Sequence, residues 1–447
     1  MAKDRIEVGD ILAAAEEAAP MASLDVVARS LRDRFDARYI SFLFVDIVGR
    51  RVVRVAEETT AQASRRAEQI PLAGSVYDEA LRDQRLVLTP DGEQSLRVVA
   101  PVTNRGDTIG VLELTLPRVS PDTLEGIEAF AHALAYIIVT DRRFTDLYHW
   151  ARRTTPMSLA AEIQRQLLPT ASCCEAAEFT FAAALVPADA AAGDTYDYSL
   201  DNDTLHLSIT DAMGHDVEAA LLATLLVNAS RTARRAGCEL AEQARRTHQA
   251  VLDHGRGALA TGQLARIALD GSGALLVNAG HPWPLRLRDG TVEELRLHTD
   301  LPFGAPFPFA YEVRELDLRP GDRLVLYTDG MQERQAGAVD LAEIIRGTAD
   351  LHPREAVQNM TTAVVYACDD HLRDDATVLC LDWHGPRADA ERPRALSLLG
   401  DARASARGTR CGTGAPDDPW TEDTSADGTP ADGTATGSTS TRGAGTP

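Results

Sequence analysis

The stretch Thr-Asp-Ala-Met-Gly-His-Asp, residues 210–216, decides how the second half of this chain is expected to fold. Before it, apolar and polar residues alternate over 205–210, which is the two-residue period of a half-buried strand. After it, residues 217–236 are rich in Ala and Leu, contain no Pro and stop at Gly237, which is typical of a helix. The carboxylate of Asp211 is therefore expected where a strand has ended and a helix has not yet begun.

Three other segments place carboxylates at the ends of predicted strands. Asp194 lies in Ala-Gly-Asp-Thr-Tyr-Asp, and Asp329 ends the apolar run Leu-Val-Leu-Tyr-Thr-Asp. Asp374 and Asp375 precede Ala-Thr-Val-Leu-Cys-Leu. If these strands share one core, their carboxylates converge. Carboxylates without His or Cys favour hard cations, Mg²⁺ or Mn²⁺ rather than zinc.

The composition limits the classes of partner and compartment. A chain of 447 residues is long enough for two or three domains. Its net charge of −22 argues against nucleic acid and against an anionic membrane as partner. We find no apolar run near the roughly 18 residues that span a bilayer, and the N-terminus lacks the apolar centre of a signal peptide. We therefore expect a cytoplasmic protein. The six cysteines contain no Cys-x-x-Cys pair and indicate neither zinc nor a disulfide scaffold.

Residues 1–140 have the element order of an α+β domain. Two helices are expected within 6–37, followed by strand pairs over 39–55 and 96–116, with a short helix at 75–82 between them. One long helix is expected over 121–150, closing this domain and continuing beyond it.

This first domain resembles a GAF domain. The resemblance rests on Arg-Phe-Asp-Ala at 34–37, Ala-Pro-Val-Thr at 100–103 and Arg-Gly-Asp-Thr-Ile-Gly-Val-Leu-Glu-Leu at 105–114. It covers roughly residues 10–140. The resemblance implies a small-molecule ligand or a dimerisation module, so a sensor pocket and a ligand-free homodimerising scaffold both stay open. Residues 38–100 contain no Cys or His to hold a haem or bilin.

Residues 141–170 are expected to form a helical linker. Thr155 would be the N-cap of a new helix and Pro156 its first residue. Apolar residues recur in it every four positions: Leu159, Ile163 and Leu167. The helix either packs on the following domain or is a connector that transmits a signal or dimerises.

Residues 171–385 are expected to form the second domain. Many antiparallel strands with a few long helices predict two packed sheets with helices outside. Beyond it, residues 386–447 are dominated by Gly, Thr, Ala, Ser, Pro and Asp. Such a segment buries too little apolar surface to offset its ordering entropy, so a disordered tail is expected.

Aspartates at strand ends that bind two divalent ions are typical of sites that catalyse metal-assisted phosphate hydrolysis. The ions would lower the pKa of a shared water and neutralise charge on the phosphoryl oxygens. Residues 159–384 resemble the bacterial stage II sporulation protein E type of serine/threonine phosphatase, in the PPM family. The motifs that carry the resemblance stand in the family's order: Ala-Glu-Ile-Gln-Arg-Gln-Leu-Leu-Pro (161–169), Ala-Gly-Asp-Thr-Tyr-Asp (192–197), Asp-Ala-Met-Gly-His (211–215), Asn-Ala-Gly-His-Pro (278–282), Leu-Pro-Phe-Gly (301–304), Tyr-Thr-Asp-Gly-Met (327–331) and Asp-Asp-Ala-Thr (374–377).

The resemblance implies an α-β-β-α sandwich that binds two Mn²⁺ or Mg²⁺ ions. It places Asp194, Asp211, Asp329 and Asp374 as the catalytic, metal-binding aspartates and the carbonyl of Ala212 as a backbone ligand. The implied activity is hydrolysis of phosphoserine or phosphothreonine by metal-bound water. The implied substrate is a phosphorylated anti-anti-sigma (STAS) protein, with the GAF-like domain as regulator.

Three departures from the family pattern stand out. The usual Gly after Met-Gly-His is Asp216 here, which adds a negative charge near the metals or caps the following helix; we favour the cap. The usual Gly-Gly-Asp begins with Ala192. No Arg precedes Asp194, whereas eukaryotic relatives use one to bind phosphate, so the group that binds phosphate here is open.

Five further residues are candidates for secondary roles. His215 is either a general acid or a hydrogen-bonding residue of the loop, and His281 is interpreted as structural. Glu333 and Asp197 could orient metal-bound waters. Asp375 is either an additional ligand or only the start of a strand.

Three functions compete at this point. The first is an active protein phosphatase, which the four intact aspartates favour. The second is a non-catalytic scaffold that captures a phosphoprotein. The third is a hydrolase of small phosphate esters, which the residues by themselves leave open.

Overall fold

The computed structural model describes most of the chain up to Arg387. The described residues are 8–46, 49–55, 67–92, 94–152, 157–188, 193–307, 310–332, 335–369 and 371–387. They form an N-terminal and a C-terminal folded region, which are described separately. The expected disordered tail at 386–447 lies outside the described residues from position 388 onward.

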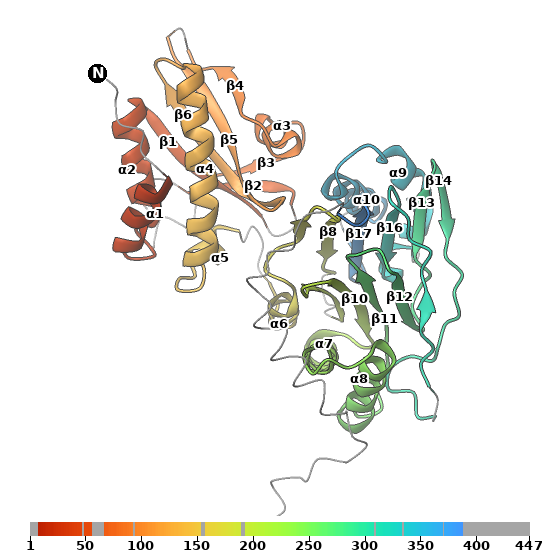
Figure 1. Cartoon of the computed structure of the whole chain (residues 1–447). Coiled ribbons are helices and arrows are strands. Elements are labelled where there is room, and N and C mark those ends of the chain that lie inside the picture. The colour runs from red at the N-terminus through yellow and green to blue at the C-terminus, as the bar shows by residue number, and fades with distance from the viewer. Residues whose placement is uncertain are drawn as a thin grey trace, which may run out of the picture. The chain divides into compact units, whose positions relative to one another are not determined.

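The N-terminal region is built on one antiparallel sheet of six strands, in the order β3-β2-β1-β6-β5-β4 (Figure 1). Its strands are β1 (Tyr39–Val45), β2 (Arg51–Val55), β3 (Gln69–Pro71), β4 (Val87–Pro90), β5 (Leu96–Asn104) and β6 (Asp107–Leu116). The strand pairs expected at 39–55 and 96–116 are confirmed. The short edge strands β3 and β4 were not predicted, because each is too short to show a period in the sequence.

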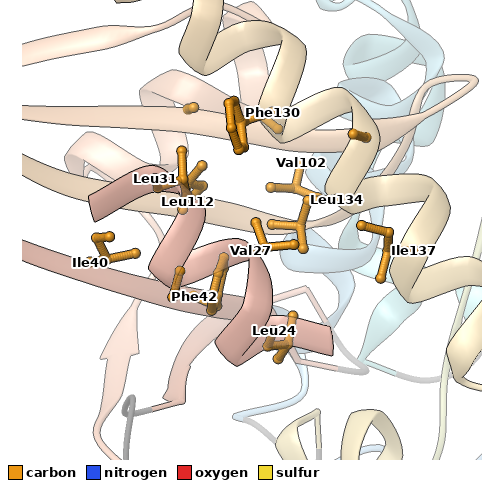
Figure 2. Packing of buried hydrophobic residues seen from close by; sticks show 14 of the residues in the cluster. Leu24, Val27, Leu31, Ile40, Phe42, Val102, Leu112, Phe130, Leu134 and Ile137 are labelled. Carbon is orange, nitrogen blue, oxygen red and sulfur yellow. The ribbon is translucent and has the colours of Figure 1, made fainter. Parts of the chain in front are cut away.

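Helices cover both faces of this sheet. They are α1 (Val8–Glu17), α2 (Ser23–Phe35), α3 (Val76–Asp83) and α4 (Pro121–Asp141). On one face, Leu24, Val27 and Leu31 of α2 and Phe130 and Leu134 of α4 pack over the sheet (Figure 2). On the other face, α3 covers a smaller apolar cluster. The α+β architecture expected for this region is confirmed.

The prediction of one long helix over 121–150 is wrong. Helix α4 ends at Asp141, and a separate short helix, α5 (Leu147–Ala151), follows. The amide of Phe144 donates to the carbonyl of Asp141 in a turn, and the Thr145 hydroxyl accepts the amide of Leu147 at 3.1 Å. A Thr side chain that accepts a hydrogen bond from the backbone competes with a continuous helix, which explains the break.

Helix α4 also corrects the expectation that no segment approaches the length of a membrane span. Within the part of the chain that the structure describes, it is the one helix long and apolar enough to cross a bilayer by length and composition alone. Eight of its residues, among them Ile127, Phe130 and Leu134, are buried in the N-terminal region. An apolar core helix passes the same test of composition.

The C-terminal region contains two antiparallel sheets, as expected (Figure 1). The first has the order β15-β12-β11-β10-β9 and the second β14-β13-β16-β17-β8-β7. The strands are β7 (Cys173–Glu175), β8 (Phe179–Val186), β9 (Asp194–Leu200), β10 (Thr204–Ala212), β11 (Ala260–Ala268), β12 (Ala274–Ala279), β13 (Leu285–Arg288), β14 (Thr291–Glu294), β15 (Arg314–Glu315), β16 (Arg323–Tyr327) and β17 (Ala376–Trp383).

Three apolar layers hold these sheets and helices together. Between the sheets lie side chains from both, such as Phe181, Ile209 and Leu379. Two helices, α7 (Asp216–Arg235) and α8 (Leu240–His254), cover the first sheet, and α9 (Leu341–Gly347) and α10 (Pro353–Ala367) cover the second. The order of layers is therefore α-β-β-α, which confirms the predicted sandwich.

Helix α6 (Leu159–Leu167) begins later than expected and buries a different face. Its N-cap is Ser158, whose hydroxyl accepts the amide of Ala161 at 3.1 Å. Residues 155 and 156, the expected cap and first residue, lie outside the described residues. Leu159 is exposed, and the buried face consists of Ala160, Ala161, Gln164 and Leu167.

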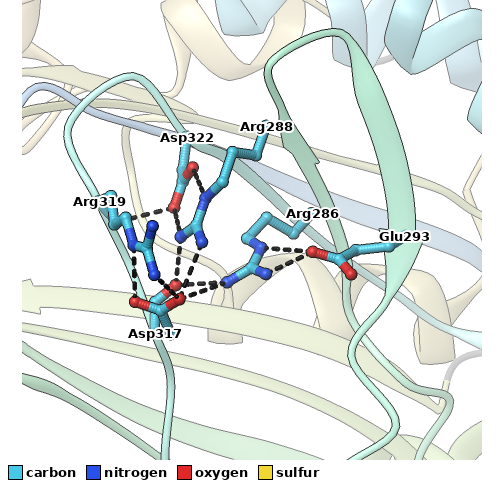
Figure 3. A network of polar contacts seen from close by, with 6 residues as sticks. All are labelled: Arg286, Arg288, Glu293, Asp317, Arg319 and Asp322. Atoms are coloured by element: carbon cyan, nitrogen blue, oxygen red, sulfur yellow. Dashed lines mark hydrogen bonds and ion pairs between the residues drawn. The ribbon is translucent and has the colours of Figure 1, made fainter.

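A network of ionic contacts fixes the β13–β14 hairpin to the segment that leads into β16 (Figure 3). Arg286 pairs with Glu293 across the hairpin, and Arg288 pairs with Asp322 at 2.6 Å. Hydrogen bonds from Arg288 and Arg319 lower the pKa of Asp317 to about 2. The network therefore orients an edge of the second sheet.

Candidate functional site

The centre of the candidate site is a pair of carboxylates on neighbouring strands. Asp194 is the first residue of β9, and Asp211 lies opposite it in β10, in the same antiparallel ladder. Asp211 is the penultimate residue of its strand rather than the first residue after it. Directly opposed residues of an antiparallel pair have Cβ atoms about 4.5–5.5 Å apart, so the two carboxylates are neighbours.

Two threonines from the second sheet hold the Asp194 carboxylate. Thr328 donates to Asp194 Oδ2 at 2.7 Å and Thr377 donates to the same atom at 2.6 Å. Burial, and then the charges of Asp211 and Asp375, raise the pKa of Asp194 well above its ordinary value. The threonine hydroxyls fix the direction of this carboxylate and act against the increase in its pKa.

Two glycines make the close backbone contacts at this site. A Cβ on Gly193 would lie 2.3 Å from the carbonyl oxygen of Ala212, and the Ala212 amide donates to the Gly193 carbonyl at 3.2 Å. A Cβ on Gly330 would lie 2.0 Å from the carbonyl oxygen of Asp375. Only glycine allows these two backbone segments to approach their neighbours so closely.

The other two predicted ligands lie at the ends of strands in the second sheet. Asp329 is half-buried and opens the turn Asp329–Met331, directly after Thr328. Asp374 is exposed, and its Oδ1 accepts the amide of Asp375 at 2.9 Å. Within the residues that the structure describes, no three or more His, Cys, Asp or Glu side chains are grouped closely enough to hold an ion. Convergence of all four aspartates therefore stays a prediction.

Asp375 is the buried member of its pair. Its Oδ1 accepts the amide of Ala188 at 2.9 Å, and its Oδ2 accepts Gln164 Nε2 at 2.5 Å. Burial raises the pKa of Asp375 despite these hydrogen bonds. Both oxygens are held by the protein, so of the two interpretations left open for Asp375, a structural role is the one that its contacts favour.

Gln164 and the two threonines were missed by the sequence analysis. Gln164 Nε2 also donates to the carbonyl of Asp194 at 2.8 Å, so helix α6 reaches both buried aspartates. A polar side chain on the buried face of an amphipathic helix is a signal that could have identified it. Thr328 and Thr377 each stand within three residues of a predicted ligand, but only the pairing of β16 with β17 directs both towards Asp194.

The contacts of Asp197 favour a structural role over the role in orienting water that the sequence suggested. Its carboxylate accepts Arg231 at 2.9 Å and 3.1 Å and Arg234 at 3.0 Å, both from α7. Arg231 also donates to the carbonyl of Leu167 at 2.6 Å. Asp197 therefore joins β9, α7 and the end of α6.

His281 is structural, as interpreted. It is 3% exposed, and its Nδ1 lies 2.8 Å from the hydroxyl of Thr261. Asn278 accepts the His281 amide and donates to its carbonyl, which closes the turn. Burial lowers the pKa of His281 to about 3.

The prediction that Asp216 caps the helix after the turn, α7, is wrong. The N-cap of α7 is His215, which makes no side-chain capping bond, and Asp216 is the first helical residue. Asp216 has φ 59°, in the left-handed region that favours glycine. Glu333, the other candidate for orienting water, lies outside the described residues.

Comparison with protein families agrees with this geometry. Residues 201–384 match the family model "Stage II sporulation protein E (SpoIIE)", and residues 20–138 match the GAF domain. The chain combines a GAF domain with a SpoIIE-type PPM phosphatase domain. The turn at 210–216 lies within the SpoIIE match. So do three of the four predicted aspartates, Asp211, Asp329 and Asp374, whereas Asp194 lies before it.

Known relatives of the SpoIIE-type domain include phosphatases. Phosphoserine phosphatase RsbU of Bacillus subtilis is 25% identical over 233 residues, which cover 50% of this chain and 69% of RsbU. The RsbU and RsbW domains of Rv1364c from Mycobacterium tuberculosis are similar at 24% identity and a TM-score of 0.42, over 52% of this chain and 68% of that one. The SiaA-PP2C domain of Pseudomonas aeruginosa is similar at 24% identity and a TM-score of 0.41, over 50% and 94%.

The donors of the SpoIIE-type site fit a divalent cation. Asp194 is buried beside Asp211, and two like charges in that position repel each other. A cation between them would offset this repulsion and keep both carboxylates ionised. The carboxylates and the nearby carbonyl of Ala212 offer oxygen only, which suits Mg²⁺ or Mn²⁺.

Proposed function

We propose that this protein is a metal-dependent serine/threonine protein phosphatase whose substrate is a phosphorylated STAS-type anti-anti-sigma protein. The observation that carries the proposal is the Asp194–Asp211 pair, which two threonines of the second sheet hold at the end of the first. The similarity to a phosphoserine phosphatase supports the type of substrate.

In this proposal, Asp194, Asp211, Asp329 and Asp374, with the carbonyl of Ala212, would hold two Mn²⁺ or Mg²⁺ ions. Such ions supply an activated water and neutralise charge on the phosphoryl oxygens. The protein's own contribution is to fix the donors. Thr328 and Thr377 orient Asp194, and Gly193 lets the Ala212 carbonyl approach it.

Charge also favours a mechanism that uses cations. The chain carries a net charge of −22, and a phosphoryl group brings about two further negative charges. Two arginines close to the central strands, Arg231 and Arg234, are paired with Asp197. Bound cations would therefore supply attraction for the phosphate that these two arginines do not.

The GAF domain is proposed to regulate this activity in the cytoplasm, through a small-molecule ligand or through dimerisation. Helix α6 is a physical route to the site, because Gln164 contacts both the Asp194 carbonyl and the Asp375 carboxylate. The helix stands directly before the phosphatase sheets in the chain.

The test is phosphate release from a STAS protein phosphorylated on serine, by the full chain with Mn²⁺, with Mg²⁺ and with excess chelator. We expect release with either ion and none with chelator. Asp211→Asn should abolish release, and Asp289→Asn, in an exposed hairpin turn, should not. Turnover that persists in chelator would contradict the metal-dependent mechanism.

The same experiment separates the competing functions. Binding of the phosphorylated STAS protein without phosphate release would favour the scaffold. Release from small phosphate esters with no greater efficiency for the phosphoprotein would favour a hydrolase of small molecules. Preference for the phosphoprotein in kcat/KM is the result expected of a protein phosphatase.

A further inference from the structure

A small pocket lies where the end of β16 meets the start of β17. The amide of Thr328 donates to the carbonyl of Thr377 at 3.0 Å and joins the two strands at the point where Asp329 and Asp374 stand. The pocket at this junction, called the strand-end pocket below, has a volume of about 70 Å³. The residues that line it are Gly330, Gln335, Ala336, Cys368, His371, Leu372, Arg373 and Asp374.

The position of the strand-end pocket connects it with the carboxylate site. Thr328 and Thr377, which join the two strands, are the residues whose hydroxyls hold the Asp194 carboxylate. Asp374, a predicted metal ligand, is itself part of the pocket wall. A group bound in the pocket therefore lies at the edge of the site in which the ions are proposed to bind.

Arg373 brings a positive charge to this pocket. Its side chain is exposed, and among the described residues of the chain it has no ion pair and no hydrogen bond. Arg231 and Arg234, by contrast, are both paired with Asp197. A guanidinium is always charged, and its planar fork of N–H donors matches two oxygens of a phosphate. Arg373 can therefore bind an anion without first breaking an ion pair.

The size of the strand-end pocket limits what it can hold. A volume of about 70 Å³ corresponds to the share of about two water molecules in the liquid. This is enough for the terminal oxygens of a phosphoryl group and too little for a nucleoside. The ligand class that fits both the charge and the volume is the phosphoryl end of a larger substrate, or inorganic phosphate.

We propose that Arg373 is a substrate-binding residue that holds the phosphoryl group from the side of the strand-end pocket. Two of its N–H groups donate to two non-bridging oxygens. The same oxygens are present in the phosphorylated substrate and in inorganic phosphate, so Arg373 binds both. His371 lines the same pocket, but a neutral imidazole has a single N–H donor and cannot make this paired contact. The inference deepens the proposed phosphatase function and rests on it.

Two measurements on the full chain with saturating Mg²⁺ test the role of Arg373. The first is kcat and KM for a phosphoserine peptide. The second is calorimetric binding of inorganic phosphate, which needs no turnover. The variants are Arg373→Ala, which removes the charge, and Arg373→Lys, which keeps the charge and loses the fork. The Mg²⁺ concentration for half-maximal activity and the melting temperature are recorded for each.

Arg235→Ala is the matched control. Arg235 is also exposed, and it is the last residue of the 20-residue helix α7, about 28 Å of helix from the turn at 210–216. Arg256→Ala tests a rival cation. Arg256 is exposed in the loop 255–259, which reaches the same turn because the Met213 amide donates to the Leu259 carbonyl at 3.0 Å.

We expect Arg373→Ala to raise the KM for the peptide and the Kd for phosphate by the same factor, on the order of 10- to 100-fold. Arg373→Lys should lie between Arg373→Ala and the wild type. The change in kcat should be smaller, because the contact exists before and after the chemical step. The half-maximal Mg²⁺ concentration and the melting temperature should stay those of the wild type, as should every value in Arg235→Ala.

An unchanged Kd for phosphate in Arg373→Ala would overturn the inference. So would a higher Mg²⁺ requirement with normal phosphate binding, which would mean that Arg373 only organises the metal loop. Loss of phosphate binding in Arg256→Ala but not in Arg373→Ala would give the contact to Arg256. If the wild type hydrolyses the peptide and Arg373→Ala matches it in both measurements, only this inference fails. If the wild type binds phosphate through Arg373 and hydrolyses no peptide, the proposed function fails and the phosphate site stands.

Discussion

Acid should destabilise the phosphatase domain through His281. This side chain is buried in the loop after β12, and burial lowers its pKa from 6.5 to about 3 in the folded state. In the unfolded chain the ring is solvated and regains its ordinary pKa. The unfolded state therefore binds more protons below pH 6.5, and stability that is present above that pH is lost as the pH falls towards 3.

The size of the effect follows from the two pKa values. At pH 5 the unfolded ring is almost fully protonated and the folded ring is not. Linkage then gives a loss of about 2 kcal/mol in the free energy of unfolding between pH 7.5 and pH 5. With a urea m-value of about 2 kcal/mol per molar, the unfolding midpoint should fall by about 1 M.

Buried carboxylates act in the opposite direction and must be separated from this effect. The raised pKa values of Asp194 and Asp375 mean that protonation of those groups favours the folded state as the pH falls. Comparison of the wild type with His281→Gln isolates the histidine, because the carboxylates are common to both. His254→Gln is the matched control, since that ring is exposed on α8.

The assay is urea unfolding at pH 7.5 and pH 5 without divalent ions, followed by tryptophan fluorescence. Trp383, which is 3% exposed in the core between the sheets, reports on this domain. The pH-dependent shift should be about 1 M smaller in His281→Gln than in the wild type and unchanged in His254→Gln. A wild type that loses no more stability than His281→Gln would refute the argument from burial.

Three further predictions concern the site. Asp211→Asn should abolish phosphoserine turnover while the melting temperature without metal stays equal or rises, because one of two repelling charges is removed; Mn²⁺ should then stabilise the wild type more than the variant. Gly330→Ala should cost about 1–3 kcal/mol in urea unfolding, since its Cβ meets a carbonyl just before β17 at 2.0 Å, whereas Gly347→Ala has open space and should be neutral. Gln164→Ala should cost about 1–3 kcal/mol and lower turnover, because it leaves a buried carboxylate without its donor; the exposed Gln166→Ala on the same helix should do neither.

Much of the fold could be predicted from the sequence, because it rests on local periodicity. The alternation over 205–210 and the Ala-rich run over 217–236 became β10 and α7 with shifts of one or two residues. The α-β-β-α sandwich followed from the family resemblance and the many short strands. Prediction failed where the sequence has no hydrophobic periodicity to follow. Strand β15 has only two residues, which is too short to show a period. Helix α4 ends at Asp141, in a turn that the hydrophobic pattern does not indicate.

The sequence predicted which residues belong to the candidate site better than it predicted which of them contact one another. The sequence identified Asp194 and Asp211, and the ladder between β9 and β10 confirms that they lie side by side. It ranked Asp374 above Asp375, and their metal roles remain untested. The structure adds that Asp375 is the buried one and that Gln164 holds it.

The sequence by itself determined which chemistry the chain can hold. Residue types are local facts, so the strand-end carboxylates and the turn that contains Gly214 could be identified without coordinates. Only the tertiary structure decided which partners those groups meet. Asp197 is bound by two arginines of α7, and Asp216 adopts a conformation suited to glycine and contacts His215. These outcomes depend on how strands and helices distant in sequence pack, and on one backbone dihedral, neither of which the pattern of residues along the chain specifies.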